Sequence, residues 1–149
     1  MRILLITQGL SPLVNSLFES HHTLVGVAED GPRVPLSRKQ RVINKMLHFS
    51  LYLINKKFEN LSHYCKRNNI PYFYIENNQE KEFENWVIDK NPDLIVVYSM
   101  SHLLKKQIFS IPKFGAINIH PSALPSYRGP NPYFWMYYNM DPVGGVTVH

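Results

Sequence analysis

Short apolar runs recur along the chain and predict the strands of one sheet. Five runs are rich in β-branched residues and lack polar alternation: residues 2–7, 23–28, 71–75, 94–98 and 115–120. Runs of this kind are typical of strands that are covered on both faces. The sheet is therefore expected to lie between two layers of helices.

Helical patterns lie between these runs. Ser11 and Pro12 provide a cap and a first-turn proline for a helix that continues through Phe18. Another helix is expected near residues 80–88, before a break at residues 91–93. Helices that connect strands in this order imply right-handed crossovers. The predicted fold is therefore α/β, a three-layer open parallel sheet.

A long helical segment is expected at residues 42–54, and it leads to residues 61–65. Its apolar stripe is broad enough to face both the sheet and a neighbour. We expect it to pack in the core, and a dimer face is the alternative. Cys65 lies within this stripe and is expected to be a small buried hydrophobic residue rather than a nucleophile.

Composition supports a globular protein. The chain has 149 residues, of which 44% are hydrophobic and 13% aromatic, and this suits one packed domain over residues 1–149. No apolar run approaches the roughly 20 residues of a membrane-spanning helix, and the N-terminus has no signal-peptide pattern, so a cytoplasmic protein is expected. The single cysteine excludes an intramolecular disulfide and a zinc ribbon.

Positive charge is concentrated in residues 33–67. The chain carries 16 basic and 11 acidic residues, and this segment holds nine of the basic residues and one acid, Glu59. A solvated helix face is the simplest interpretation. A phosphorylated ligand or RNA is the alternative partner for such a local excess.

The carboxyl ends of the predicted strands are where an open parallel sheet binds ligands. Residues 7–12 follow the first strand and contain one glycine, which gives no support for NAD or for a P-loop nucleotide. Residues 98–104 follow the fourth strand and turn toward a helix. Free amides there could hold a flat heterocycle, or the segment could be an ordinary strand-to-helix turn.

The end of the fifth strand places an amide and an imidazole together. Asn118 and His120 are two residues apart, so strand periodicity directs both side chains to one face. Such a pair can stabilise an oxyanion, although a structural histidine is a competing interpretation and a metal site lacks its other ligands. Four prolines and one glycine in residues 121–132 indicate a rigid irregular loop of the kind that carries function.

Residues 115–149 resemble the formyltransferases that use 10-formyltetrahydrofolate. The shared composite motif is Asn-x-His-Pro-Ser, then Leu-Pro, Arg-Gly and Gly-Val-Thr-x-His, in this order. The resemblance is dense over residues 93–149 and weaker over residues 1–92. It implies a Rossmann-like catalytic domain, 10-formyltetrahydrofolate as co-substrate and no metal.

The resemblance also implies roles for individual residues. Asn118 and His120 match the catalytic residues of the family. The residues that match its folate-binding positions are Tyr98, Ser99, Met100, Ser101, His102, Leu103, Leu104 and His149. The residues that match its active-site loop are Pro121, Ser122, Leu124, Pro125, Arg128 and Gly129.

Two departures from the family pattern bear on activity. The third catalytic residue is an aspartate that the family places a few residues beyond the position of His149, and Asp141 lies in the turn before that strand. We therefore expect an incomplete catalytic domain with weak activity or none by itself. Ala123 stands where the family usually has leucine, a small change in pocket volume.

The acceptor is expected to be a primary amine, and the resemblance favours an amino sugar attached to a nucleotide, because residues 99–104 and 128–135 look more like the sugar enzymes of the family. Glycinamide ribonucleotide and methionyl-tRNA are the alternative acceptors. A non-catalytic folate-binding fragment is the alternative from another class. A homodimer is possible, RNA binding is the weaker hypothesis, and no membrane partner is expected.

Overall fold

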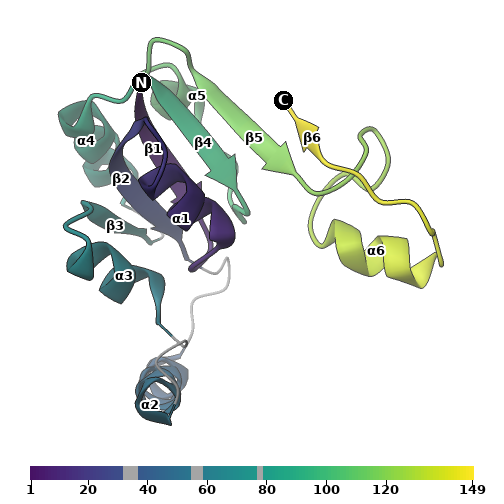
Figure 1. Cartoon of the computed structure of the whole chain (residues 1–149), viewed down its shortest axis with the longest axis horizontal. Helices are drawn as coiled ribbons and strands as arrows, with labels where there is room; N and C mark the ends of the chain where they lie inside the picture. Colours follow the sequence, from purple (N-terminus) through teal and green to yellow (C-terminus); the bar gives the residue numbers. More distant parts are fainter. Residues whose placement is uncertain (32–36, 55–58, 77–78) are drawn as a thin grey trace.

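The computed structural model describes residues 1–31, 37–54, 59–76 and 79–149, and these residues form a six-stranded sheet with helices on both faces (Figure 1). The strands are β1 (Arg2–Thr7), β2 (Thr23–Asp30), β3 (Tyr72–Ile75), β4 (Leu94–Tyr98), β5 (Ala116–His120) and β6 (Thr147–Val148). Their order is β3-β2-β1-β4-β5-β6. The five apolar runs are thus confirmed as the five parallel strands. The sixth strand, β6, is not among the predicted runs, and it pairs antiparallel to β5.

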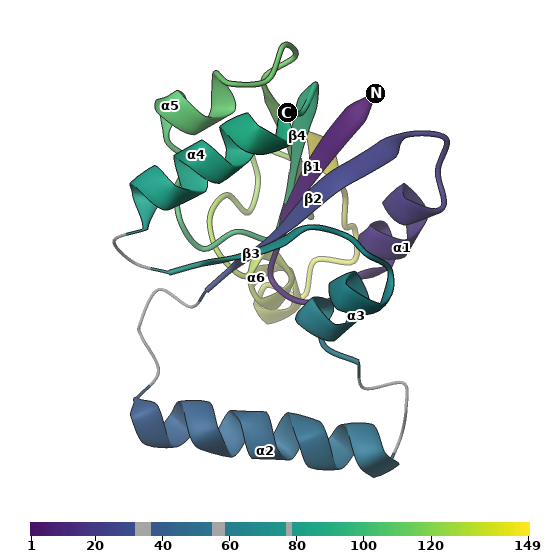
Figure 2. The same ribbon diagram turned by 90° about the vertical axis from the view of Figure 1, so that its left-hand side faces the viewer.

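The helices in the described residues are α1 (Pro12–Phe18), α2 (Arg38–Ile54), α3 (Leu61–Arg67), α4 (Glu80–Lys90), α5 (Lys106–Phe109) and α6 (Pro132–Tyr138). Helices α1 and α3 cover one face of the sheet, and α4 and α5 cover the other (Figure 2). Ile3 and Leu5 of β1 belong to the core cluster that includes residues of α1 and α3. Leu4 and Ile6 belong to the cluster that includes residues of α4 and α5. The alternation along β1 therefore builds both cores, which confirms the three-layer prediction.

Cys65 is a core residue, as predicted. It is fully buried in α3 and packs in the same cluster as Val14 and Leu61. Burial disfavours the thiolate and raises the pKa of the thiol to about 11. A thiol in this environment is not a nucleophile at neutral pH.

The expectation that the apolar stripe of residues 42–54 packs in the core is wrong for the side chains that the structure describes. Helix α2 lies apart from the sheet and from α1 and α3 (Figures 1 and 2). Leu47 is 57% exposed, and Val42, Ile43 and Met46 are also exposed. The physical reason is that α1 and α3 already cover this face of the sheet, where Val14 and Leu61 are no more than 1% exposed. The dimer face stays a prediction.

The basic segment is spread over α2 and α3. Arg38, Lys39 and Lys45 lie in α2, and Arg67 of α3 forms an ion pair with Glu59 at 2.8 Å. Arg33, Lys56 and Lys57 lie outside the described residues. No helix in the described ranges combines the length and the apolar composition needed to cross a membrane.

The loop after β5 packs closely against the chain that enters β6. A Cβ atom at Gly145 would lie 2.8 Å from the Ala123 Cβ and 3.0 Å from the Ala123 nitrogen. Beside this contact, the Thr147 hydroxyl donates to the Ser122 carbonyl at 2.7 Å and accepts from the Leu124 amide at 3.0 Å. Gly145 is therefore required by the close approach of two backbones.

We expect the exposed stripe of α2 to contribute little to stability. Leu47→Ala should lower the free energy of unfolding by about 0.5 kcal/mol or less, whereas Leu61→Ala in the core should lower it by about 2–5 kcal/mol. Urea denaturation followed by circular dichroism compares the two. Equal losses would show that α2 packs in the core.

We also expect Gly145→Ala to displace β6 from the loop, because the added methyl group meets backbone. The cost should be about 1–3 kcal/mol, as for an overpacked site. Gly144→Ala is the matched control, since the nearest atom to its Cβ would be the Met136 sulfur at 4.0 Å. Thermal unfolding of the two variants provides the measurement, and a Gly145→Ala protein as stable as the control would contradict the close approach.

Candidate functional site

The carboxyl ends of β1, β2, β4 and β5 lie at one edge of the sheet, because these strands are parallel and adjacent. The segment after β4 does not turn directly into a helix as expected. Residues 99–105 form a loop, and α5 begins only at Lys106. Ser99 has a left-handed backbone with φ 65°, which ends the strand and prevents a helix from starting there.

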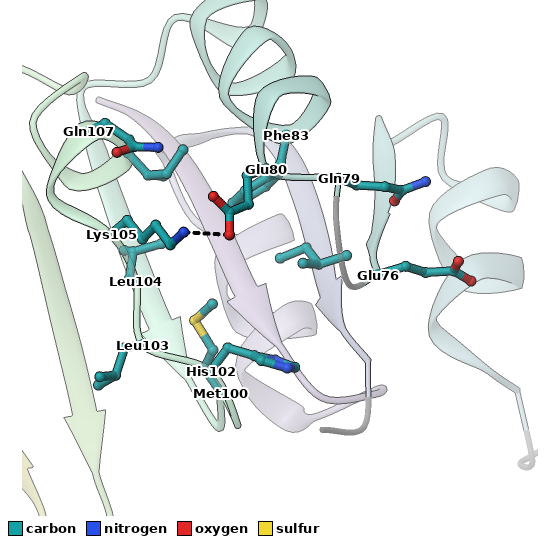
Figure 3. Close-up of a pocket in the computed structure, with 12 residues that line it drawn as sticks. Glu76, Gln79, Glu80, Phe83, Met100, His102, Leu103, Leu104, Lys105 and Gln107 are labelled. Carbon is teal, nitrogen blue, oxygen red and sulfur yellow. Dashed lines mark ion pairs between the residues drawn. The ribbon is translucent and has the colours of Figure 1, made fainter. Parts of the chain in front are cut away.

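This loop lines a cavity of about 410 Å³ (Figure 3). Met100, His102, Leu103 and Leu104 form one side. Its other lining residues are Ile75, Glu76, Gln79, Glu80, Phe83, Lys105, Gln107 and Ile108. Lys105 and Glu80 form an ion pair across it. An apolar cavity of this size with a few polar groups is typical of a small-molecule site.

The predicted folate-binding residues thus separate into groups. Four line the cavity, whereas Tyr98, Ser99 and Ser101 do not. Tyr98 packs against the core on the α1 and α3 side. Ser99 donates its hydroxyl to the Gln8 Oε1 at 3.3 Å, and the Ser101 hydroxyl accepts from the Gln8 amide.

A buried carboxylate that the sequence analysis missed lies behind this loop. Asp30, the last residue of β2, has a fully buried side chain. It accepts from the Ser101 amide at 2.6 Å and the Gln8 amide at 3.1 Å, and it lies 2.7 Å from the His102 Nδ1. Its position at a carboxyl strand end was the signal that could have revealed it.

The predicted catalytic pair lies on β5, where both residues are half-buried. The Asn118 amide nitrogen is 3.0 Å from the His149 Nε2, and the two backbones exchange hydrogen bonds of 2.7 and 3.1 Å. The His120 Nε2 lies 3.0 Å from the Tyr127 carbonyl. A carbonyl only accepts hydrogen bonds, so this nitrogen carries the proton. His149, predicted as a folate-binding residue, contacts Asn118, and Asn118, His120 and His149 do not line the cavity.

The predicted active-site loop is held by side-chain contacts. Ser122 is fully buried and donates its hydroxyl to the Ser126 carbonyl at 2.8 Å. The Leu124–Pro125 peptide bond is cis. Arg128 and Gly129 are exposed, and Pro121 is half-buried. The predicted site residues thus lie in two places: β5 contacts the loop that follows it, and four of residues 100–104 line the cavity.

Two further findings concern the chemistry available here. Within the described part of the chain, no group of three or more His, Cys, Asp or Glu residues is arranged to hold a metal ion. Ala123 contacts Gly145 and does not line the cavity beside residues 99–104. Nothing in the structure explains why alanine stands at this position.

Relatives of known identity match much of the chain. The chain is 44% identical over 81 residues to methionyl-tRNA formyltransferase of Clostridioides difficile, a match that covers 54% of the chain and 26% of that protein. It is 33% identical over 137 residues to methionyl-tRNA formyltransferase of Alkaliphilus oremlandii, covering 92% and 39% respectively. The chain spans well under half the length of these two relatives.

Solved structures share the fold. Phosphoribosylglycinamide formyltransferase from Anaplasma phagocytophilum superimposes with a TM-score of 0.68 at 18% identity, over 100% of this chain and 63% of that chain. Formyltetrahydrofolate deformylase from Pseudomonas syringae pv. tomato superimposes with a TM-score of 0.65 at 18% identity, over 99% and 45%. The family model described as Formyl transferase matches residues 40–149. Since this match covers most of the chain, including β5 and its loop, the protein belongs to the formyl transferase family.

Proposed function

We propose that the protein transfers a formyl group from 10-formyltetrahydrofolate to a primary amine. The observation that carries this proposal is the placement of Asn118 and His120 on one face of β5 at the carboxyl edge of the sheet. The matches to formyltransferases support the reaction class. Residues 1–149 would supply one catalytic domain of the protein.

The chemistry requires a group that stabilises negative charge on the formyl oxygen. The amine nitrogen forms a bond to the formyl carbon, the bond from that carbon to the donor nitrogen breaks, and one proton passes from the amine to the donor nitrogen. Asn118 has two amide hydrogens, and its contact with His149 uses one of them. The other is available to donate to the developing oxyanion.

His120 is suited to handle the proton or the oxyanion. Its Nε2 donates to the Tyr127 carbonyl, which fixes the orientation of the ring. Its Nδ1 is then the atom that can accept or deliver a proton. The aspartate that the family resemblance implies would complete the proton transfer.

We propose the cavity beside residues 99–104 for the pterin ring of the formyl donor. Met100, Leu103 and Leu104 offer apolar surface for the faces of the ring, and His102 offers a polar edge. A volume of about 410 Å³ is in the range of cavities that bind small molecules.

For the acceptor we propose an amino sugar attached to a nucleotide. Arg128 is exposed, and so are the rings of Tyr133, Phe134 and Trp135 in α6. An arginine can pair with a diphosphate, and exposed aromatic rings can stack on a base. Methionyl-tRNA is the second candidate, because both of the relatives described above are named for it and the exposed helix α2 carries Lys39 and Lys45.

Competition between acceptors tests the proposal. The purified protein is given 10-formyltetrahydrofolate with equal amounts of a nucleotide amino sugar, glycinamide ribonucleotide and charged initiator tRNA, and products are measured by mass spectrometry. We expect the formylated sugar to dominate. Exclusive formylation of the tRNA, reduced by Lys39→Ala and by salt, would refute the sugar assignment. Folate binding without transfer to any amine would favour the non-catalytic alternative.

The roles of Asn118 and His120 lead to a separate prediction. In an intact enzyme that contains residues 1–149, Asn118→Ala and His120→Ala should each lower kcat by about 100-fold or more, the cost of losing an oxyanion donor. Asn15→Ala in α1 and His21→Ala before β2 are matched controls on exposed residues away from this edge, and they should keep kcat. Steady-state kinetics checks this, and full activity in both β5 variants would refute the assigned site.

A further inference from the structure

Asp30 places a negative charge where solvent does not reach. Its side chain is fully buried at the end of β2, and its partners follow β1, the neighbouring strand, and β4, the strand beyond it. A buried carboxylate is tolerated only when its oxygens are hydrogen-bonded. The hydrogen-bond partners of the Asp30 carboxylate therefore indicate its role.

The partners of Asp30 all belong to the cavity edge of the sheet. Oδ2 accepts from the Ser101 amide and from the Gln8 side chain, and Oδ1 meets the His102 Nδ1. An ionised carboxylate only accepts hydrogen bonds, so His102 must carry a proton on Nδ1. The remaining ring nitrogen, Nε2, is the one that stays available.

The loop that lines the cavity depends on these contacts. Among the described residues, no backbone–backbone hydrogen bond outside helices and strands involves residues 99–104. Ser99 adopts an unfavourable left-handed backbone. The loop is instead attached through side chains: Asp30 holds Ser101 and His102, and Gln8 holds Ser99 and Ser101.

We propose that Asp30 is a positioning residue that fixes the Nδ1-protonated form of His102, so that Nε2 of this ring serves the cavity as a polar contact for the ligand. His102 lines the cavity and is 31% exposed at its side chain (Figure 3). A neutral ring of this tautomer accepts a hydrogen bond at Nε2. It selects a heterocycle that presents an N–H group at this edge. The ligand part of the inference rests on the proposed folate function, and the tautomer part does not.

The decisive variant is Asp30→Asn, which keeps the shape of the side chain. It can still accept from the Ser101 amide, but its NH₂ group cannot accept from His102. Asp93→Asn is the matched control, because the Asp93 Oδ2 accepts from the Arg2 amide at 2.7 Å at the amino edge of the same sheet. Each variant replaces a carboxylate that accepts from a backbone amide. Only the Asp30 carboxylate contacts a residue that lines the cavity.

The first measurement is the tautomer of His102 in the ligand-free protein, by two-bond ¹H–¹⁵N correlation of the imidazole, with the signal assigned through His102→Gln. We expect a proton on Nδ1 in the unmodified protein and in Asp93→Asn, and a shift toward the Nε2-protonated form in Asp30→Asn. A purely structural carboxylate would leave the tautomer unchanged. If the His102 Nδ1 carries no proton in the unmodified protein, the proposal is overturned, whatever the variants show.

The second measurement is the Kd of tetrahydrofolate by calorimetry under argon. Asp30→Asn and His102→Gln should each weaken binding by about 10-fold, which corresponds to the loss of one hydrogen bond, and Asp93→Asn should bind as the unmodified protein does. Unchanged affinity in a folded Asp30→Asn overturns the proposal. If the unmodified protein fails to bind tetrahydrofolate, the proposed donor site is wrong, and the tautomer measurement alone decides the role of Asp30.

Discussion

Burial of both faces of β1 is the constraint on which the other features depend. Leu4, Leu5 and Ile6 are fully buried, and they supply side chains to the cores on the two sides of the sheet. Because β1 pairs in parallel with β2 and β4, its register fixes where those strands end. Gln8, Asp30 and Ser99 consequently follow or close three adjacent strands at one edge, which brings polar groups from distant parts of the sequence within hydrogen-bonding distance.

Side chains hold the loops at this edge in place, because the backbone hydrogen bonds between the strands end there. Asp30 and Gln8 do this for residues 99–104, and Thr147 does it for the loop after β5. Asp30 is buried and Thr147 is half-buried, whereas Gln8 is exposed, and burial makes an unsatisfied polar atom costly. The hydrogen bonds that stabilise these loops therefore also fix the orientation of the polar side chains in them.

The apolar pattern was sufficient to predict the parallel strands and the positions of Asn118 and His120, because strand periodicity directly determines which side chains share a face. It could not predict that α2 stays apart, since periodicity identifies an apolar face and says nothing of whether α1 and α3 already occupy the space. β6 has two residues, too few for a periodic signal. Asp30 was missed because its partners, Ser101 and His102, are 71 and 72 residues away in the sequence.

Because β6 pairs antiparallel with β5, the orientation of the Asn118 side chain depends on His149, which follows it by 31 residues. The backbone N–H and C=O of Asn118 both form hydrogen bonds with the His149 backbone, and the Asn118 side-chain amide contacts the imidazole of the same residue. A carboxamide on a strand end would otherwise rotate between several orientations. The Asn118 amide, the proposed oxyanion donor, is therefore oriented by a segment that folds back through Gly145, where a side chain would prevent the close approach to Ala123. Residues 118–122 and 145–149 are therefore linked structurally: the first segment carries the proposed donor, Asn118, and the second segment holds its amide in one orientation.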